Sequence, residues 1–324
     1  MGKILITGAG GFIGSHLAER CVELGYSVRA YVHYNSKNGW GWLDSSSSKS
    51  DMEIVAGDIR DYDSVLKAIN GCDTVFHLAA LIGIPYSYTS PLAYLRINIE
   101  GTYNILESSK NFHLESVLIT STSETYGSAQ TVPINESHPS VGQSPYSASK
   151  IAADQLAISY HRSFGLPVKI VRPFNTFGPR QSARAVIPTI ITQLLDGRQE
   201  LQLGNTDPTR DLTFVRDTVE GFIEISKCPS LFGEATNIGM NEETSIGDLA
   251  HLIAELMGLP CKITTDGERI RPVRSEVDRL RADNSKLMEK TPWRPRYGLQ
   301  AGLLETISWF REHGRDYKTN IYNV

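Results

Sequence analysis

The sequence contains few of the features that mark secreted, membrane-embedded or metal-binding proteins. Only four of its 324 residues are cysteines, and Cys21, Cys72, Cys228 and Cys261 lie far apart, without a CxxC pair or a matching histidine spacing. This pattern argues against a disulfide framework and against the usual zinc sites, and it favours reduced thiols. The eight histidines show no ligand spacing either, so we expect no metal.

Long apolar runs and runs of one charge are also missing. No stretch reaches the roughly 18–20 apolar residues that span a bilayer, and residues 3–7 lead into a glycine turn instead of a signal-peptide core. The formal net charge is -4, without a basic run, which argues against nucleic acid or an anionic membrane as partner. We therefore expect a cytoplasmic protein that binds neither.

What the sequence does contain is an alternation of short apolar segments and amphipathic helices. It begins with a strand at residues 3–7 and a helix after the glycine turn, and it continues to about residue 173. Strands that are apolar throughout and separated by helices indicate a parallel sheet covered on both faces. The expected class is α/β. Residues 1–174 would form a Rossmann doubly wound domain, and residues 175–324 mainly a smaller C-terminal lobe with segments that return to the sheet.

Three glycines, Gly8, Gly11 and Gly14, form a G-x-x-G-x-x-G turn between the first strand and the first helix. Glycines there permit a tight turn and a close approach of the backbone to a pyrophosphate at the positive helix N-terminus. In this position the pattern predicts a dinucleotide site.

The end of the second strand lacks the acid that usually binds the adenosine ribose of NAD. That region contains His33, Asn35, Ser36 and Lys37, which would tolerate a 2′-phosphate, although it contains no arginine. The sequence therefore favours NADP at least as strongly as NAD as the cofactor. Asp58, after the third strand, has two interpretations: a bond to the adenine amino group, or a helix N-cap.

Tyr146 and Lys150, in SPYSASKIAADQ, lie four residues apart on a predicted helix, so their side chains leave the same face. The ammonium and the field of a cofactor would lower the pKa of the Tyr146 phenol and make it a base near neutral pH. Before this helix, STSETYG places the carboxylate of Glu124 among hydroxyl side chains. Alone, that segment is equally compatible with a solvated turn.

Together these motifs resemble the extended short-chain dehydrogenase/reductase family. The matching pieces span essentially the whole chain: TGAGGFIGSHL, GDIRD, HLAA, NIEGTYNILE, STSETYG, YSASK, RPFNTFGPRQ, RDLTFVRD and ADNSK. The resemblance implies NAD or NADP, tightly bound and regenerated in each turnover, and a nucleotide-sugar as substrate in the C-terminal lobe. It also implies a homodimer formed through two helices per subunit, one of them the helix that carries Tyr146.

The same resemblance assigns catalytic and cofactor residues. Thr122, Tyr146 and Lys150 match the family's catalytic Thr/Ser, Tyr and Lys, and Asn98 matches a supporting asparagine. His77 is expected to be structural. Further cofactor contacts are implied for Phe12, Ile13, Ile59, Leu78, Ala79 and Ala80.

A sugar diphosphate needs cationic donors, and the guanidinium fork of arginine matches phosphate oxygens. Among the candidates Arg210 is preferred, although any one arginine more often forms a surface ion pair. Ser87 is a candidate for a sugar contact, with a turn hydroxyl as the alternative. The diphosphate candidates are Asn175, Arg180, Arg210, Arg271 and Arg274.

Glu124 separates the reactions that this family performs. C4 epimerases usually carry small residues there, whereas a carboxylate suits an elimination in which Glu124 removes the C5 proton and water leaves from C6. Dehydratases that act on dTDP-glucose typically read S-T-D-E, and here Ser123 stands in place of the acid that assists the leaving hydroxyl. STSE resembles GDP-mannose 4,6-dehydratases and also UDP-glucuronate decarboxylases.

Further segments narrow the resemblance: YNSKNGWGWLD, LIGIPYSYTSP, GQSPYSASK and RQSARAVIPTIITQ. They are similar to bacterial dehydratases of nucleotide-linked N-acetylglucosamine in legionaminic or pseudaminic acid pathways. The expected function is thus an NAD(P)-dependent 4,6-dehydratase, a lyase, with UDP-N-acetylglucosamine as substrate. A UDP-glucuronate decarboxylase or a 4-epimerase is the alternative. A non-catalytic dinucleotide-binding regulatory protein is the alternative of another class.

Overall fold

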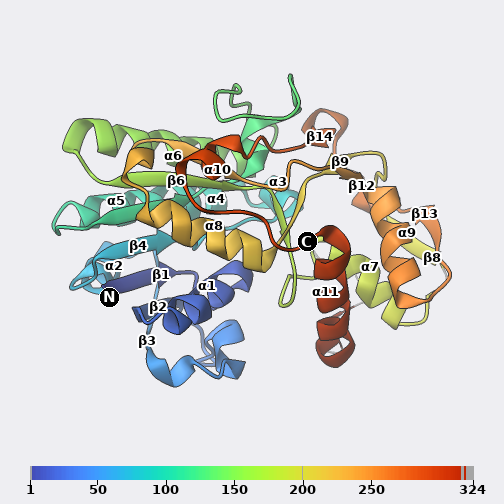
Figure 1. Cartoon of the computed structure of the whole chain (residues 1–324), viewed down its shortest axis with the longest axis horizontal. Helices are drawn as coiled ribbons and strands as arrows, with labels where there is room; N and C mark the ends of the chain where they lie inside the picture. Colours follow the sequence, from blue (N-terminus) through green and yellow to red (C-terminus); the bar gives the residue numbers. More distant parts are fainter. Residues whose placement is uncertain (1, 199, 315–316, 319–324) are drawn as a thin grey trace.

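A parallel seven-stranded sheet lies at the centre of the computed structural model, which describes residues 2–198, 200–314 and 317–318 (Figure 1). The strand order is β11-β6-β5-β4-β1-β2-β3, and neighbouring strands pair in parallel. The order reverses between β1 and β4, as in a doubly wound sheet, so the expected fold class is confirmed. The strands are β1 Lys3–Thr7, β2 Ser27–His33, β3 Met52–Gly57, β4 Thr74–His77, β5 Ser116–Thr120, β6 Val168–Pro173 and β11 Ala235–Ile238.

Helices cover both faces of this sheet. One layer contains α2, α5 and α6, which contact one another in that order, and the opposite layer contains α1 and α8, which lie side by side (Figure 1). The helices are α1 Phe12–Glu23, α2 Tyr62–Ile69, α5 Gly101–Ser109, α6 Pro145–Phe164 and α8 Val215–Lys227.

The strands separate two hydrophobic cores because successive side chains point to opposite faces. Leu5 packs with the α2–α5–α6 layer, while its neighbours Ile4 and Ile6 pack with the α1–α8 layer. In β5, Val117 and Ile119 alternate with Leu118 in the same way. This explains why the strands read as continuous apolar runs.

Short elements follow β2, β4 and β5, and the second of those after β2, η2, leads directly into β3. The segment after β4 continues through α3 and α4 into a π-helical turn, η3, that leads directly into α5. These elements are η1 Gly41–Ser45, η2 Lys49–Asp51, α3 Ile84–Thr89, α4 Pro91–Tyr94, η3 Leu95–Glu100 and the 3₁₀ turn η4 Ser123–Tyr126.

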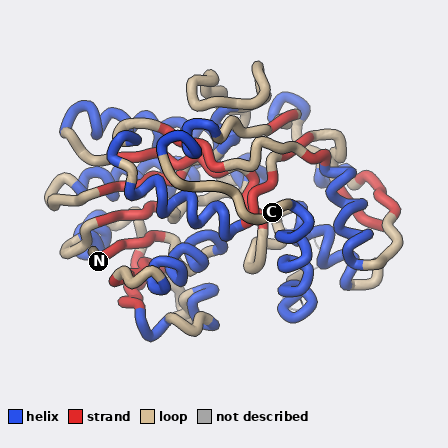
Figure 2. Tube along the Cα trace, viewed as in Figure 1, coloured by secondary structure: helices blue, strands red, loops and turns tan. Residues whose placement is uncertain are grey.

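The C-terminal lobe contains three longer helices, one short helix and short strands, joined by long connections (Figure 2). The helices are α7 Val186–Leu195, α9 Ile246–Met257, α10 Ser285–Lys290 and α11 Leu299–His313, with the 3₁₀ turns η5 Pro229–Leu231, η6 Gly267–Arg269 and η7 Val273–Ser275. The strands are β7 Asn175–Phe177, β8 Glu200–Leu203, β9 Thr209–Arg210, β10 Leu212–Phe214, β12 Thr244–Ser245, β13 Lys262–Thr265 and β14 Arg279–Leu280.

Strand β11 and helix α8, which both follow residue 174, return to the central sheet. Strand β11 pairs with β6 at one edge, and α8, which the sequence pattern did not reveal, covers the sheet beside α1. The boundary between two lobes at residue 174 therefore stays a prediction, and segments from both sides of it contribute to this sheet. Within the described part of the chain, no helix has both the length and the apolar character to span a membrane.

Replacement of Phe222 tests the role of α8. The Phe222 side chain is fully buried, and its ring centroid lies 6.5 Å from that of Phe76 in β4. Phe222→Ala should lower the free energy of unfolding by about 3–5 kcal/mol through the cavity it leaves. Urea denaturation would measure this loss. Leu259→Ala, at a 41 % exposed side chain, is the control and should change stability by only about 0.5 kcal/mol. Equal midpoints for the two variants would contradict the packing described.

Candidate active site

The glycine turn brings the start of α1 close to the end of β1. Gly8 has φ +70°, and a Cβ there would lie 2.8 Å from the Ala79 nitrogen; a Cβ on Gly14 would lie 2.2 Å from the Gly8 oxygen. Gly11 occupies the N-cap of α1, which has no side-chain cap. The N–H groups at this helix start therefore face no capping side chain, as a pyrophosphate site requires.

The loop after β4 is fixed against this turn by Thr7. Its Oγ1 accepts hydrogen bonds from the nitrogens of Leu78 and Ala79, both at 3.2 Å, and contacts His77 Nδ1 at 2.8 Å. Burial lowers the pKa of His77 to about 3, so the ring is neutral at physiological pH. His77 thus lies in the core, between β1 and α5, where its Nε2 meets Thr102 Oγ1 at 3.2 Å.

The side chains after β2 differ in whether they are free to contact a cofactor. His33 and Ser36 are exposed. Asn35, in contrast, closes its own turn, because its Nδ2 donates to the Gly39 carbonyl at 2.7 Å and its Oδ1 accepts from the Gly39 nitrogen at 3.2 Å. The structure therefore gives Asn35 a loop-closing role, and its expected contact with the cofactor stays a prediction.

Asp58 is not an N-cap, so that interpretation is wrong. Asp61 caps α2 and accepts from the nitrogens of Asp63 and Ser64. Asp58 instead binds Arg60, whose Nε lies 3.0 Å from Oδ1, and this bond lowers the pKa of Asp58. Arg60 is an exposed cation that follows β3. The prediction about a cation near the adenosine ribose covered only the residues after β2, so it did not include Arg60.

Tyr146 and Lys150 lie on the inner face of α6, with only 6 % and 5 % of their surfaces exposed. The helix begins with Ser144 and Ser147 in a capping box around Pro145. Lys150 Nζ donates to the Thr120 carbonyl at 2.8 Å, and burial raises the pKa of Tyr146 while the Thr122 hydroxyl lowers it. Burial also lowers the pKa of Lys150 to about 8.

Glu124 lies on the short turn η4, which follows β5. Thr122 caps η4, and its Oγ1 accepts from the Glu124 nitrogen at 3.2 Å. Ser123 is buried, whereas Glu124 is partly exposed. The Glu124 charge raises the pKa of both Tyr146 and Arg210, so the carboxylate lies within electrostatic reach of both.

Two predicted substrate arginines share one carboxylate. Arg210, 6 % exposed, places Nη2 3.1 Å from Glu276 Oε1, and Arg271 Nη1 lies 3.4 Å from the same oxygen. Burial lowers the pKa of Arg210. The sequence did not indicate Glu276 as the partner of Arg210, because only the fold brings residues 210 and 276 together.

The remaining candidates have different surroundings. Arg180 binds Glu19 of α1 at 2.9 and 3.0 Å, so its guanidinium is already paired and lies against the first helix. Arg274 is exposed. Ser87 is fully buried and donates to the Ile84 carbonyl at 2.6 Å, which favours the turn hydroxyl over a sugar contact. Asn175 Oδ1 is buried and finds no hydrogen-bond partner within the described residues.

Asn98 supports the loop after β4. Its Oδ1 accepts from the Leu81 nitrogen, and its Nδ2 donates to the Leu81 carbonyl and to Ser149 Oγ, each at 2.9 Å. The amide thereby joins this loop to α6, one residue before Lys150. Across residues 2–198, 200–314 and 317–318, no cluster of His, Cys, Asp or Glu side chains has the arrangement of a metal site.

Comparison with known proteins places this geometry in context. The sequence pattern of the family described as GDP-mannose 4,6 dehydratase matches residues 5–306. A dTDP-glucose 4,6-dehydratase of an Actinoplanes species is 32 % identical over 95 % of this chain and 98 % of its own. A UDP-N-acetyl-alpha-D-glucosaminuronate decarboxylase of Bacillus cytotoxicus is 34 % identical over 97 % and 99 %.

Solved structures show the same fold. The dTDP-glucose 4,6-dehydratase DesIV of Streptomyces venezuelae, crystallised with NAD and TYD, superposes with a TM-score of 0.88 at 28 % identity, covering 98 % of this chain and 99 % of its own. The likeness therefore extends over both lobes.

A Gly14→Ala variant tests the dinucleotide site. Because the new Cβ would lie 2.2 Å from the Gly8 oxygen, the helix start must move away from β1. Affinity for NAD or NADP should fall at least ~10-fold, which corresponds to ~1.4 kcal/mol. Isothermal titration calorimetry with both dinucleotides would measure this. Gly298→Ala, where a Cβ meets open space, is the control, and unchanged affinity for Gly14→Ala would rule out the site.

Proposed function

Because this chain belongs to the GDP-mannose 4,6 dehydratase family, we propose that it is an NAD(P)-dependent nucleotide-sugar 4,6-dehydratase acting on UDP-N-acetylglucosamine, with the cytoplasm as its expected location. The observation that carries the proposal is the position of Glu124. Its carboxylate lies within electrostatic reach of both Tyr146 and Arg210. A base in that position is needed for elimination and not for epimerisation.

The residues around the glycine turn fit a dinucleotide. Gly8, Gly11 and Gly14 leave room for a pyrophosphate, and Thr7 holds the loop of Leu78 and Ala79 against them. When bound, the nicotinamide supplies the acceptor for a hydride from C4 and its later return to C6. The absence of an acid after β2 and the presence of Arg60 are compatible with both NAD and NADP.

Tyr146 would begin the reaction by taking the proton of the sugar O4 hydroxyl. Its buried phenol has a raised pKa without ligands, so positive charge must be added before it can act near neutral pH. Lys150, five per cent exposed and on the same helix face, is the protein's own source of such charge. Thr122, whose hydroxyl lies beside Tyr146, would orient the substrate oxygen.

Glu124 would perform the elimination. Oxidation at C4 acidifies the C5 proton, Glu124 removes that proton, and the C6 hydroxyl leaves as water. Because Ser123 is not an acid, Glu124 would also return the proton that the leaving hydroxyl needs. The proton that Tyr146 took from O4 would pass to solvent, and a solvent proton would return to C5 as the hydride returns to C6. The sugar then loses one water, and Tyr146, Glu124 and the cofactor end in their starting states.

The C-terminal lobe supports a sugar diphosphate as the ligand. Arg210 and Arg271 converge on Glu276, and a diphosphate would compete with this carboxylate for them. Asn175 lies at the first residue of β7 with an unsatisfied side-chain oxygen. We propose UDP-N-acetylglucosamine as the substrate because several segments of the sequence resemble dehydratases that act on this sugar nucleotide. In addition, the decarboxylase of Bacillus cytotoxicus is named for a related N-acetylated substrate.

That relative also favours a second candidate, a sugar-nucleotide decarboxylase. Release of carbon dioxide from UDP-glucuronate or UDP-N-acetylglucosaminuronate would support it. A C4 epimerase is the third candidate, since proteins named UDP-glucose 4-epimerase are relatives as well. Unchanged product mass with inverted C4 would indicate that activity.

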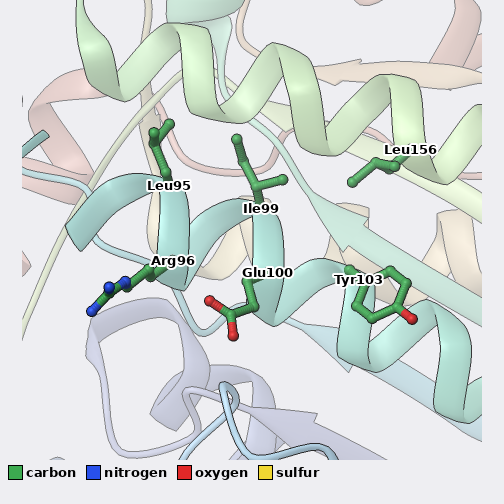
Figure 3. Close-up of a pocket in the computed structure, with 6 residues that line it drawn as sticks. All are labelled: Leu95, Arg96, Ile99, Glu100, Tyr103 and Leu156. Atoms are coloured by element: carbon green, nitrogen blue, oxygen red, sulfur yellow. The ribbon is translucent and has the colours of Figure 1, made fainter. Parts of the chain in front are cut away.

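We also propose that the protein is a homodimer. An open groove of about 400 Å³ lies between η3, the start of α5, and α6. Figure 3 shows Leu95 and Ile99 pointing toward α6, from which Leu156 points back. Leu95 and Tyr103 are each 44 % exposed. An apolar groove beside the helix that carries Tyr146 suits the four-helix contact that the family resemblance implies.

Replacement of Glu124 tests the main proposal. Glu124→Gln removes the base but keeps the size of the side chain, so C4 oxidation should continue while water loss falls ~10²- to ~10⁴-fold. Mass spectrometry of the sugar nucleotide would follow water loss, and the absorbance of reduced nicotinamide would follow oxidation. Glu115→Gln, at an exposed carboxylate, is the control. Near-normal dehydration by Glu124→Gln would end its role as base.

Leu95→Glu tests the dimer. An exposed charge in the groove should leave the monomer folded and prevent association, so light scattering after gel filtration should report half the mass of the wild type. Leu304→Glu changes a side chain of similar exposure, 50 %, on α11 and should remain dimeric. A monomeric wild type, or a dimeric Leu95→Glu, would contradict this assignment.

A further inference from the structure

We propose that Asp154 is a positioning residue for the reaction: its buried carboxylate anchors the Ser121–Glu124 segment to α6 and supplies the negative charge that the Lys150 ammonium faces. The inference rests on the proposed function, because it serves the C4 oxidation assigned to Tyr146 and Lys150. Nothing in the sequence motifs singled out this residue.

Asp154 continues the row of active-site side chains on α6. Tyr146, Lys150 and Asp154 follow one another at intervals of four residues, so they lie along one face of the helix. Their exposed fractions fall from 6 % to 5 % to 1 %. This face packs against β6 and the η4 turn, which places the carboxylate behind the site and out of water.

The first contact of Asp154 reaches the catalytic turn. Its Oδ2 accepts a hydrogen bond from Ser121 Oγ at 2.9 Å. Ser121 immediately precedes Thr122, and its nitrogen donates to the Val171 carbonyl at 2.7 Å. Because Thr122 caps the turn that carries Glu124, a shift at Ser121 would move both catalytic side chains.

The second contact reaches the other end of the same turn through Arg172 of β6. Arg172 Nη2 and Nε lie 2.8 and 3.2 Å from Asp154 Oδ2. The guanidinium carbon lies 4.8 Å from the centroid of the Tyr126 ring, and Tyr126 is the last residue of η4. Asp154 therefore holds the start of this segment directly and its end indirectly.

The other carboxylate oxygen of Asp154 makes neither of these contacts. Oδ1 is buried and has no hydrogen-bond partner within the residues that the structure describes. An unpaired carboxylate oxygen in a dry environment is costly unless a positive charge lies nearby. The charge of Lys150 lowers the pKa of Asp154, and that of Asp154 raises the pKa of Lys150, so each lies within electrostatic reach of the other.

Lys150 depends on this charge because its surroundings otherwise disfavour the ammonium. Burial lowers the pKa of Lys150 to about 8, and Asp154 opposes that shift. On β4, His77 is neutral; on β6, Arg172 is paired with Asp154; on α6 itself, Tyr146 is uncharged below its raised pKa. The Glu124 charge acts on Tyr146. Removal of the Asp154 charge should lower the pKa of Lys150 further, so that the ammonium loses its proton at a lower pH.

The charge role can be measured without substrate. Competitive acetylation of Lys150 across pH, read by mass spectrometry of its peptide, reports the titration midpoint of the amine. Asp154→Asn should lower the midpoint by on the order of one pH unit. Asp154→Asn/Arg172→Gln, which leaves no unpaired Arg172 charge in the core, should lower it as well. Asp217→Asn, at a buried carboxylate on α8, should leave it unchanged.

Two outcomes would overturn the charge role. One is an unchanged midpoint in folded Asp154→Asn. The other is a return to the wild-type midpoint in the double variant, which would make Asp154 merely a counter-ion of Arg172. If Asp154→Asn fails to fold, the double variant decides.

The anchoring role needs a separate variant. Ser121→Ala cuts the hydrogen bond to Asp154 and leaves every charge in place. With UDP-N-acetylglucosamine, kcat for reduction of the bound nicotinamide should fall about 10-fold while KM and the Lys150 midpoint stay unchanged. An unaltered kcat would overturn the anchor. A wild type that never converts this sugar nucleotide would refute the proposed function, while the acetylation midpoints would still decide the charge role of Asp154.

Discussion

The parallel direction of β1, β4, β5 and β6 is the constraint on which the site depends. Because the four strands run in parallel, their carboxyl ends meet at one edge of the sheet. Residues far apart in the chain are thereby brought together: the glycine turn after Thr7, the loop after His77, the turn after Thr120 and the segment after Pro173. A parallel sheet must be covered on both faces, and the long α6 that covers one of them carries Tyr146 and Lys150 to the same edge.

Buried hydrogen bonds hold the irregular segments at this edge. Thr7, His77 and Thr102 join β1, β4 and α5 through contacts of 2.8 and 3.2 Å. Asn98 joins the loop after β4 to α6, and Asp154 joins α6 to Ser121, at the start of the segment that carries Glu124. Buried polar groups are costly when unpaired, so each of these chains of contacts restricts its loop to one arrangement.

Burial has opposite effects on the two central ionisable groups. It raises the pKa of Tyr146 and lowers that of Lys150, and both shifts favour the uncharged forms. Chemistry at neutral pH therefore depends on charges supplied around them. Arg210 and Arg271, the arginines proposed to bind the diphosphate, are held together by Glu276, so the two cations are already assembled without an anion.

The amino-acid sequence by itself determined the α/β class, the glycine turn and the spacing of Tyr146 and Lys150, because these features are local. Continuous apolar strands, glycines at a turn and a four-residue interval on a helix depend only on neighbouring residues. The sequence pattern did not reveal α8 as a helix, although the structure shows that many of its residues are buried.

Only the tertiary structure decided which polar side chains meet. Asp61 and not Asp58 caps α2, Arg180 pairs with Glu19, and Glu276 holds Arg210 across 66 positions of the chain. Asp154 lies against Ser121 and Arg172 because β5, β6 and α6 pack together. Hydrogen bonds and ion pairs of this kind act over a few ångströms in space, and sequence spacing carries no record of them.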